Sequence, residues 1–326
     1  MKSYFLGVDI GGSKSHALIS DEHGNALGFG SYGPGNHEVV GYEGLALALR
    51  SVTENALEMA ALRKAQISAA GFGVAGYDWP SERQPTLDAI TTIGLNAPLE
   101  SVNDTIIGLL AGATQGWGVA VVAGTGTNCW GWDKDHRVGR VTGVGYGEYG
   151  GAGDLIYRAL SAIAFEWTQR GPKTLLTPEF LRLTGANDIP TLIEGIEMGE
   201  YYLGSDYAPV IYQVAVQGDP VAHSIIEWGG KELGATALAV IRQLNLQELE
   251  FEVVLVGSLY QMGEMLINPM RQIITSEAPN ARLICLSSPP VVGGVLLAMQ
   301  QLKLDTAPIR DHLIKSTCSC INEQAL

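Results

Sequence analysis

The alternation of apolar and polar positions divides the chain into two halves with the same order of elements. In the first half, short apolar runs bounded by glycine predict strands, and apolar residues recurring every three or four positions predict helices. The expected strands lie at 4–10, 15–21, 25–32, 68–75 and 99–103, and the expected helices at about 39–63, after Pro80 and at 105–113. A tight glycine turn joins the first two strands, which predicts an antiparallel hairpin.

The second half begins with three similar strands and again continues with helices and strands. The expected strands lie at 118–124, 128–132, 137–143, 251–258 and 281–287. The expected helices lie in a long region from about 153 to 250, with breaks near 171 and 187, and at 259–276 and 291–302. Residues 303–326 show no clear pattern and are expected to form a loose tail.

This repeat predicts an α/β protein of two related lobes, each a mixed sheet with flanking helices, with a ligand cleft between them. We expect an N-terminal lobe at 1–114 and a C-terminal lobe at 115–289. The second lobe should carry a helical insertion at about 153–250, and the final helix, at about 290–302, is expected to pack back on the first lobe.

The charge of the chain narrows the classes of ligand. Its 326 residues include 20 Lys and Arg against 34 Asp and Glu, a formal net charge of −14. Such a surface repels phosphate backbones, so no nucleic-acid partner is expected. No apolar run is long enough to span a bilayer, and the N-terminus lacks the apolar core of a signal peptide. We therefore expect a cytoplasmic protein without a membrane partner.

The first candidate for phosphate binding is the turn formed by Gly11, Gly12, Ser13 and Lys14. Glycine lets backbone N–H groups approach phosphate oxygens without interference from a Cβ atom, while the serine adds a hydroxyl and the lysine a positive charge. Asp9 ends the preceding strand and is well placed to hold Mg²⁺ through water, because Mg²⁺ prefers one or two carboxylates and retains waters. The alternative is that the glycine turn only closes a structural hairpin and binds no phosphate.

A second glycine turn, Gly124, Thr125 and Gly126, occupies the equivalent place in the second half. One glycine hairpin is common, but two at matching positions of repeated lobes favour a shared function. Facing each other across a cleft, the two turns would bind the phosphates of a nucleotide from both sides.

Asp104 ends a predicted strand and opens the helix that starts at Thr105. A carboxylate in this place lies at the lip of a sheet, with the helix N-terminus behind it. The position is also that of a plain N-cap, where aspartate is favoured without any chemistry. The helix dipole is expected to favour the ionised form and so to make Asp104 a weak base.

The two turns and the segments around them resemble the N-acetylglucosamine kinases and the wider BadF/BadG-type ATPases. The matching segments are GVDIGGSKSHALISDEHGNALG at 7–28, GPGNH at 33–37, FGVAGYD at 72–78, VNDTIIGLLAGA at 102–113, VVAGTGTNCWG at 121–131, AVQGDPVAHSI at 215–225, VVLVGS at 253–258 and PPVVGGVLLAM at 289–299. They follow the order of the family over most of the chain. These proteins belong to the actin/hexokinase/Hsp70 superfamily, so the resemblance implies two ribonuclease-H-like lobes.

The resemblance also implies roles for the residues that match. Asp104 matches the catalytic aspartate, which also contacts the sugar. The remaining matches are the phosphate loops Gly11 to Ser13 and Gly124 to Thr127, the adenosine-side residues Gly257 and Ser258, and the sugar-side residues Asn36, Thr127 and Asn128. The implied reaction uses ATP and Mg²⁺ to phosphorylate an amino-sugar, N-acetylglucosamine to its 6-phosphate, and the expected assembly is a homodimer.

One segment departs from the family. Where relatives often have Gly-Asp-Glu-Gly-Ser, whose acid binds sugar hydroxyls, this chain has Gly147-Glu148-Tyr149-Gly150-Gly151. Glu148 is a candidate to reach a hydroxyl with its longer side chain, but the change leaves the acceptor open, so glucosamine or another hexose remains an alternative.

Two further functions remain open on the residues alone. The first is an ATP-driven activator of a radical enzyme, which would need cysteines for an iron–sulfur cluster. The four cysteines, Cys129, Cys285, Cys318 and Cys320, show no such spacing. The second is a non-catalytic sugar sensor, which would have no need of Asp104.

Overall fold

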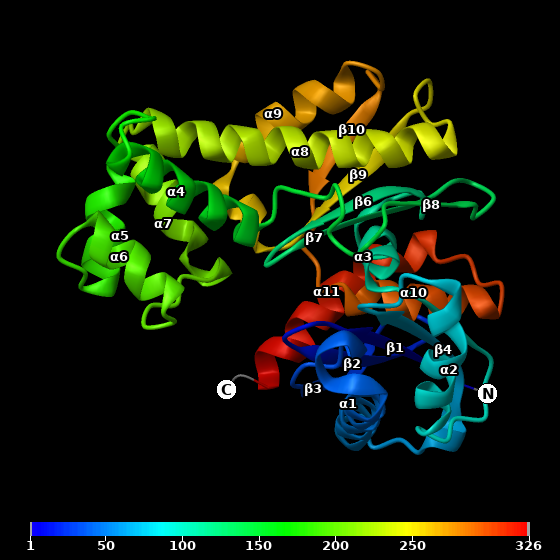
Figure 1. Cartoon of the computed structure of the whole chain (residues 1–326). Coiled ribbons are helices and arrows are strands. Elements are labelled where there is room, and N and C mark those ends of the chain that lie inside the picture. The colour runs from blue at the N-terminus through cyan, green and yellow to red at the C-terminus, as the bar shows by residue number, and fades with distance from the viewer. Residues whose placement is uncertain (1, 325–326) are drawn as a thin grey trace.

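The chain folds into two lobes, each built on a five-stranded mixed sheet (Figure 1). The computed structural model describes residues 2–324. In Figure 1 the first lobe, in blue and cyan, lies below the second, in green to orange. The α/β class and the two related lobes expected from the sequence repeat are confirmed.

The first sheet has the strand order β3-β2-β1-β4-β5. Neighbouring strands pair antiparallel within β1–β3, whereas β1, β4 and β5 run parallel to one another. Parallel neighbours need a crossover connection, which α1 (His37–Met59) and α2 (Arg83–Thr91) provide. The strands are β1 (Tyr4–Ile10), β2 (Ser15–Asp21), β3 (Ala26–Tyr32), β4 (Ile67–Val74) and β5 (Leu99–Asn103).

The second sheet repeats this topology with the order β10-β9-β6-β7-β8. Its first three strands are again antiparallel, and β6, β9 and β10 are parallel. The third strand is shorter than the expected 137–143, because pairing with β7 ends at Arg140. The strands are β6 (Gly118–Ala123), β7 (Thr127–Trp132), β8 (Val138–Arg140), β9 (Phe251–Val256) and β10 (Ala281–Cys285).

Helices fill the long interval between β8 and β9. They are α4 (Ala152–Trp167), α5 (Leu176–Thr184), α6 (Ile189–Glu197), α7 (Ala208–Val216) and α8 (Pro220–Leu244). The helices α4–α7 stand to one side of the second sheet in Figure 1, and the long α8 returns along it. After β9, a short 3-10 turn at Ser258–Met262 precedes α9 (Glu264–Thr275). The single helix expected at 259–276 is thus broken at Gly263, which has a φ of 63°.

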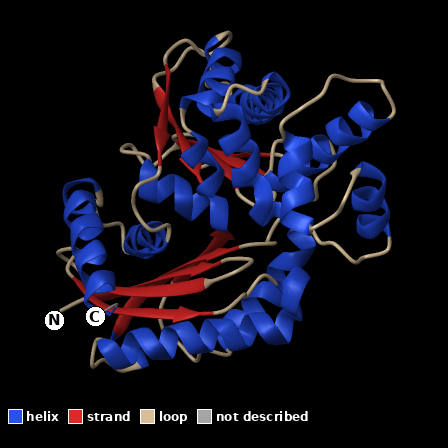
Figure 2. Cartoon of the chain, turned by 90° about the vertical axis from the view of Figure 1, so that its left-hand side faces the viewer, coloured by secondary structure: helices blue, strands red, loops and turns tan. Residues whose placement is uncertain are grey.

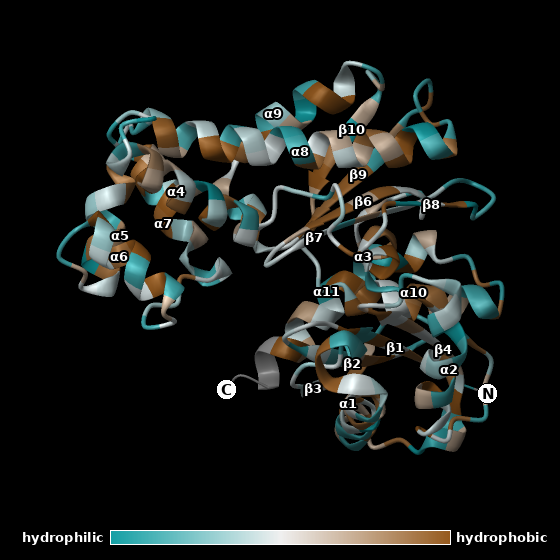
Figure 3. Cartoon of the chain, in the orientation of Figure 1, coloured by the Kyte–Doolittle hydropathy of each residue, from teal (hydrophilic) through white to brown (hydrophobic). Residues whose placement is uncertain are grey.

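Helices cover both faces of the first sheet, as the two layers beside the lower sheet in Figure 2 show. On one face, Leu6, Val8 and Ile10 of β1 share a core with α1. On the other face, Phe5 packs with α10 (Val291–Gln301). A strand buried on both faces is apolar along its length, which explains the continuous apolar run in the sequence and the brown strands of Figure 3.

Helix α3 (Asp104–Gly112) lies between the two lobes and packs against both. Its residues Ile106, Leu109 and Leu110 share a core with Trp132 and Val254 of the second sheet. Residues 105–112 are all buried, and a helix that is apolar on every side is one that is enclosed by its neighbours. The helix that begins with Asp104 is therefore held by both lobes.

The expectation of a loose tail at 303–326 is wrong for residues 307–324, because α11 (Ala307–Gln324) forms there and packs on the first lobe; residues 325–326 lie outside the described part of the chain. Leu313, Thr317 and Cys320 recur at helical spacing and are buried. The Ser316 hydroxyl accepts the N–H of Ala26 at 2.9 Å. The apolar periodicity of this helix is weak in the sequence because few apolar residues of α11 pack on the first lobe.

None of the helices within residues 2–324 combines the length and the apolar character that crossing a bilayer requires.

Candidate active site

Three aspartates lie near one edge of the first sheet. The strands β1, β4 and β5 are parallel, so their C-terminal ends meet at this edge. Asp9 is near the end of β1, Asp78 is in the loop after β4, and Asp104 follows β5 directly. The C-terminal edge of parallel strands is where α/β sheets usually bind ligands.

Asp104 is the first residue of α3, and its neighbour Asn103 is the N-cap. The Asn103 Oδ1 accepts the N–H of Thr105 at 2.9 Å. The alternative that Asp104 is itself the N-cap is therefore wrong. Burial, together with the negative charge of Asp78, raises the pKa of Asp104 to about 7. This corrects the expectation of a weak base, because desolvation outweighs the helix dipole.

Asp9 is half-buried beside this carboxylate. Burial raises the pKa of Asp9 to about 8, and the negative charge of Asp104 adds to the effect. No cationic side chain in the described part of the chain forms an ion pair with Asp9. Two mutually repelling carboxylates without a counter-charge fit a site for a divalent cation.

The donor set around Asp9 suits Mg²⁺ better than a metal held by protein ligands alone. Within residues 2–324 there is no group of three or more His, Cys, Asp or Glu side chains that could hold a metal ion. Mg²⁺ does not need one, since it binds through one or two carboxylates and completes its shell with water and phosphate oxygens. Asp9 therefore fits the role expected of it.

Asp78 is a site residue that the sequence reasoning missed. Its side chain is buried, and its Oδ1 accepts hydrogen bonds from Asn103 Nδ2 at 3.1 Å and Asn128 Nδ2 at 3.3 Å. The first partner belongs to the first lobe and the second to β7, so the carboxylate connects the two lobes. Burial raises its pKa to about 6. The available signal was its place just beyond a central strand, like Asp9 and Asp104.

The first glycine turn leaves backbone donors free. The N–H of Gly11 donates to the carbonyl of Lys14 at 3.1 Å, which closes the turn. The amides of Gly12 and Ser13 donate no backbone hydrogen bond to any described residue. A Cβ on Gly12 would meet no atom within 4 Å, so the space above the turn is open. The turn can therefore accept a phosphate group, with the exposed Lys14 beside it.

The second glycine turn is backed by a helix N-terminus. The carbonyls of Gly124 and Thr125 accept the N–H groups of Ala152 at 2.9 Å and Gly153 at 3.2 Å, in the first turn of α4. A Cβ on Gly124 or on Gly126 would meet no atom within 4 Å. The positive end of a helix dipole favours anions, so this turn also suits phosphate.

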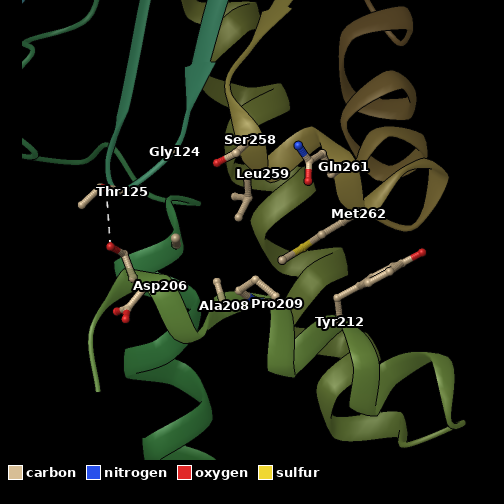
Figure 4. A pocket seen from close by; sticks show the side chains of 12 residues that line it. Gly124, Thr125, Asp206, Ala208, Pro209, Tyr212, Ser258, Leu259, Gln261 and Met262 are labelled. Carbon is tan, nitrogen blue, oxygen red and sulfur yellow. Dashed lines mark hydrogen bonds between the residues drawn. The ribbon is translucent and has the colours of Figure 1, made fainter. Parts of the chain in front are cut away.

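A cavity of about 410 Å³ opens beside the second turn (Figure 4). Thr125 stands at one end of it in Figure 4, and Tyr212 and Met262 stand at the other. The Ser205 hydroxyl donates to Thr125 Oγ1 at 3.4 Å, which ties the insertion to the turn. Apolar walls with a few polar groups are typical of nucleoside pockets. The lining residues are Gly124, Thr125, Ala152, Ser205, Asp206, Ala208, Pro209, Tyr212, Ser258, Leu259, Gln261 and Met262.

The sequence anticipated only part of this cavity. Ser258 lines it as expected. Gly257 is not among the lining residues; its φ is 118°, and a Cβ there would lie 2.2 Å from the carbonyl oxygen of Ala123, so a nucleotide-binding role for Gly257 stays a prediction. The residues from the helical insertion, among them Asp206 and Tyr212, were missed because they carry no motif and lie far from the turn in sequence.

Two of the expected sugar-side asparagines lie next to the Asp78 loop. Asn36 caps α1 by accepting the N–H of Glu38 at 2.9 Å. A Cβ on Gly76 would lie 2.4 Å from Asn36 Oδ1, so the two loops are in contact. Asn128, which follows Thr127 at the start of β7, bonds Asp78 directly. The fold thus gathers Asn36, Asn128 and Asp78 near Asp104.

Glu148 occupies a different environment from the one expected of a free sugar ligand. Its carboxylate is buried and accepts N–H groups of Gly143 at 3.0 Å and of Gly145 at 3.2 Å. These bonds shape the glycine-rich loop in which Glu148 lies. A direct contact between Glu148 and the sugar remains a prediction.

The cysteines form no cluster among the described residues. Cys129 and Cys320 are buried, whereas Cys285 and Cys318 are exposed on different elements. Burial strongly raises the pKa of the Cys129 thiol, which keeps it protonated. Among the described residues, therefore, no set of cysteines is gathered into an iron–sulfur site within one chain.

Comparisons with known proteins agree with this geometry. An N-acetylmuramic acid/N-acetylglucosamine kinase from Clostridium acetobutylicum is 26% identical over 305 residues, covering 91% of this chain and 99% of that protein. An N-acetyl-D-glucosamine kinase from Dictyostelium discoideum is 26% identical over 319 residues, covering 93% and 99%. A crystal structure from Chromobacterium violaceum, assigned to the N-acetylglucosamine kinases, shares the fold with a TM-score of 0.68 and 22% identity, covering 90% of this chain and 98% of that one.

The family model of the BadF/BadG/BcrA/BcrD ATPases matches residues 6–298, a span that contains both glycine turns, the three aspartates and the cavity. The chain therefore belongs to the BadF/BadG/BcrA/BcrD ATPase family.

Proposed function

We propose that this protein transfers the γ-phosphoryl group of ATP to the 6-hydroxyl of N-acetylglucosamine. The observation that carries the proposal is Asp104, a half-buried carboxylate with a pKa of about 7 between two lobes that each present an open glycine turn. A general base is most effective when its pKa is close to the working pH. The names of the two relatives with 26% identity support the amino-sugar as acceptor.

In the proposed reaction the sugar hydroxyl oxygen forms a bond to the γ-phosphorus while the bond to the β-phosphate bridging oxygen breaks. The hydroxyl proton passes to Asp104, and ADP leaves. Phosphoryl transfer has a loose transition state, so alignment and charge neutralisation matter more than full deprotonation. Asn36, Asn128 and Asp78 would orient the sugar, and the position of Asp104 between the two lobes would limit the access of water.

The nucleotide would bind with its adenosine in the 410 Å³ cavity and its phosphates between the two turns. The free amides of Gly12 and Ser13 would bind phosphate oxygens, and the dipole of α4 would favour a phosphate at the second turn. Mg²⁺ would be held by Asp9 through water, and it would neutralise the phosphates. We place the reaction in the cytoplasm, where ATP is available.

An ATP-dependent phosphorylation screen tests the proposal. N-acetylglucosamine, glucosamine, N-acetylmannosamine and glucose are offered separately, and ADP and sugar phosphate are measured together. Asp104→Asn should lower kcat by about 10²- to 10⁴-fold with little change in ATP affinity, as loss of a general base does. Asp88→Asn, on the exposed side of α2, is the matched control. Unchanged turnover in Asp104→Asn, or no turnover of any sugar by the wild type, would refute the proposal.

A further inference from the structure

Arg140 is an arginine whose position is fixed from several sides. Its backbone N–H donates to Gln243 Oε1 at 2.9 Å, and its carbonyl accepts from Gln243 Nε2 at 3.0 Å. Its Nη1 donates to the carbonyls of Val141 at 3.1 Å and Thr142 at 3.3 Å. The backbone and one end of the guanidinium are thus both held.

Two tryptophan rings also contact the guanidinium. Its Cζ lies 4.5 Å from the ring centroid of Trp79 and 5.2 Å from that of Trp130. Trp130 is the direct cross-strand partner of Arg140, whereas Trp79 comes from the loop after β4 in the other lobe. Cation–π contacts of this kind stabilise and orient the planar group.

This arrangement leaves hydrogen-bond donors of Arg140 unused. A guanidinium has five N–H groups, of which Nη1 supplies two. The remaining three, on Nε and Nη2, make no hydrogen bond to any residue in the range 2–324, and no carboxylate there forms an ion pair with Arg140. The Nε and Nη2 edge of arginine is a fork that matches a carboxylate.

Arg140 lies beside open space and close to residues proposed to bind the acceptor. Arg140 and Trp79 line two cavities, one of about 430 Å³ and one of about 400 Å³. The first is also lined by Asp78 and Asn103, and the second by Glu148. Arg140 lies near enough to Asp78 to lower its pKa, against the larger effect of burial.

The charges around the first cavity are mixed in a chain of strongly negative net charge. Arg140 and Arg83 are its cations, Asp78 and Glu100 its carboxylates, and His136 also lines it. A carboxylate entering here would therefore meet repulsion except at the fork of Arg140 or at Arg83. An acidic ligand could therefore bind in this cavity only with its carboxylate at one of these two arginines.

We infer that Arg140 anchors a carboxylate-bearing substituent of the acceptor, so that the protein phosphorylates acidic amino-sugars as well as neutral ones. The inference rests on the proposed kinase function. The Trp79 and Trp130 rings hold the guanidinium plane, and the Nε and Nη2 edge donates two parallel hydrogen bonds to the carboxylate. The loss of these two hydrogen bonds should slow the phosphorylation of acidic acceptors and leave that of neutral acceptors unaffected.

Kinetics with two acceptors test the inference. The neutral probe is N-acetylglucosamine, and the acidic probe is N-acetylmuramic acid, the same sugar carrying a lactyl carboxylate. In Arg140→Met, kcat/KM for the acidic probe should fall about 10- to 100-fold, the usual effect of losing charge-assisted hydrogen bonds, while the neutral probe changes less than about 3-fold. Arg140→Lys keeps the charge but loses the pair of parallel donors. Its kcat/KM for the acidic probe should therefore lie between that of the wild type and that of Arg140→Met. Arg137→Met, which removes an arginine already paired with Asp133, is the control.

The outcomes separate the inference from the proposed function. If the wild type phosphorylates the neutral probe but not the acidic one, the inference is wrong and the kinase function stands. An equal loss with both probes in Arg140→Met would also overturn it and would make Arg140 a contact between the lobes. If neither sugar is phosphorylated, the proposed function fails and the inference with it. As a measure independent of turnover, the acidic probe should alter tryptophan fluorescence in the wild type and not in Arg140→Met.

Discussion

The chemistry of the site depends on three carboxylates whose pKa values rise through burial. A helix N-terminus stabilises a carboxylate by up to about 2 kcal/mol, which corresponds to roughly 1.5 pKa units. Desolvation can raise the pKa of a carboxyl group by up to about 3–5 units when burial is complete, and by part of that when the group is half-buried. The larger effect decides the outcome at Asp104, whose pKa is about 7 although it opens a helix. Asp104 is therefore a better base than its sequence position suggests.

The pH dependence of turnover should report this carboxylate. Asp104 must be ionised to accept a proton. When ATP, Mg²⁺ and sugar are all saturating, kcat should therefore rise with pH through an apparent pKa near 7. The charge of Asp78 contributes to that value. Asp78→Asn removes the charge but can keep both hydrogen bonds to Oδ1, so it should move the acid limb about 0.5–1 unit toward lower pH. A pH–kcat profile of both proteins checks this.

Asp88→Asn is the control for the loss of one negative charge outside the site, and its pH–kcat profile should match that of the wild type. An acid limb that stays in place, or moves to higher pH, in Asp78→Asn would show that Asp78 does not act on the titrating group.

At the scale of elements, several glycines let backbones meet. Gly293 of α10 lies against α3, and a Cβ there would be 1.8 Å from the carbonyl oxygen of Ile107. The position therefore accepts no larger side chain without moving one helix away from the other. This contact determines how α3, and with it Asp104, sits between the lobes.

Gly293→Ala should lower the free energy of unfolding by about 3 kcal/mol, because the extra carbon must displace backbone rather than a flexible side chain. Chemical denaturation followed by circular dichroism measures the change. Gly33→Ala is the matched control, since a Cβ at Gly33 meets no atom within 4 Å. Equal stability of the two variants would mean that the α3–α10 contact can relax.

Helix α11 secures the opposite end of α3. Arg310 Nη2 donates to the carbonyls of Ala111 and Gly112, each at 2.6 Å, at the C-terminus of α3. The last carbonyls of a helix have no partner within it, and a cation is favoured there by the dipole. One end of α3 thus carries Asp104, and the other is held by α11.

Arg310→Met should cost about 1–3 kcal/mol of stability, the usual effect of leaving buried carbonyls unsatisfied. Thermal and denaturant unfolding measure it, with the exposed Lys315→Met on the same helix as control. If the two variants are equally stable, water replaces the guanidinium and the contact is not structural.

At the scale of the whole molecule, the first lobe is completed by the end of the chain. The core that contains Phe5, Leu18 and Phe29 also contains residues of α10 and α11. We propose that the structural first lobe comprises residues up to about 114 together with those from about 289 onward. The sequence places these segments far apart.

A fragment of residues 1–114 should therefore fail to unfold cooperatively on its own, because one face of its sheet would be exposed. Joining residues 288–324 to it through a flexible linker should restore a cooperative transition. Thermal unfolding of the two fragments, followed by circular dichroism, compares them. Cooperative unfolding of residues 1–114 alone would contradict this account of the lobe.

The homodimer expected from the resemblance stays a prediction. Sedimentation velocity of the purified chain would decide it.

The sequence by itself determined the positions of most strands along the chain, the internal repeat and the two glycine turns, because these depend on local apolar periodicity and on backbone geometry that neighbouring residues specify. It also indicated Asp104 and Asp9, which directly flank or end strands. The tertiary structure alone decided that Asp78 lies beside the other two aspartates and that desolvation raises the pKa of Asp104. It alone formed α11, lined the cavity beside the second glycine turn with residues of the insertion and placed Arg140 in contact with two tryptophans. Each of these features depends on segments distant in sequence, and on a desolvation that exists only once they have packed together.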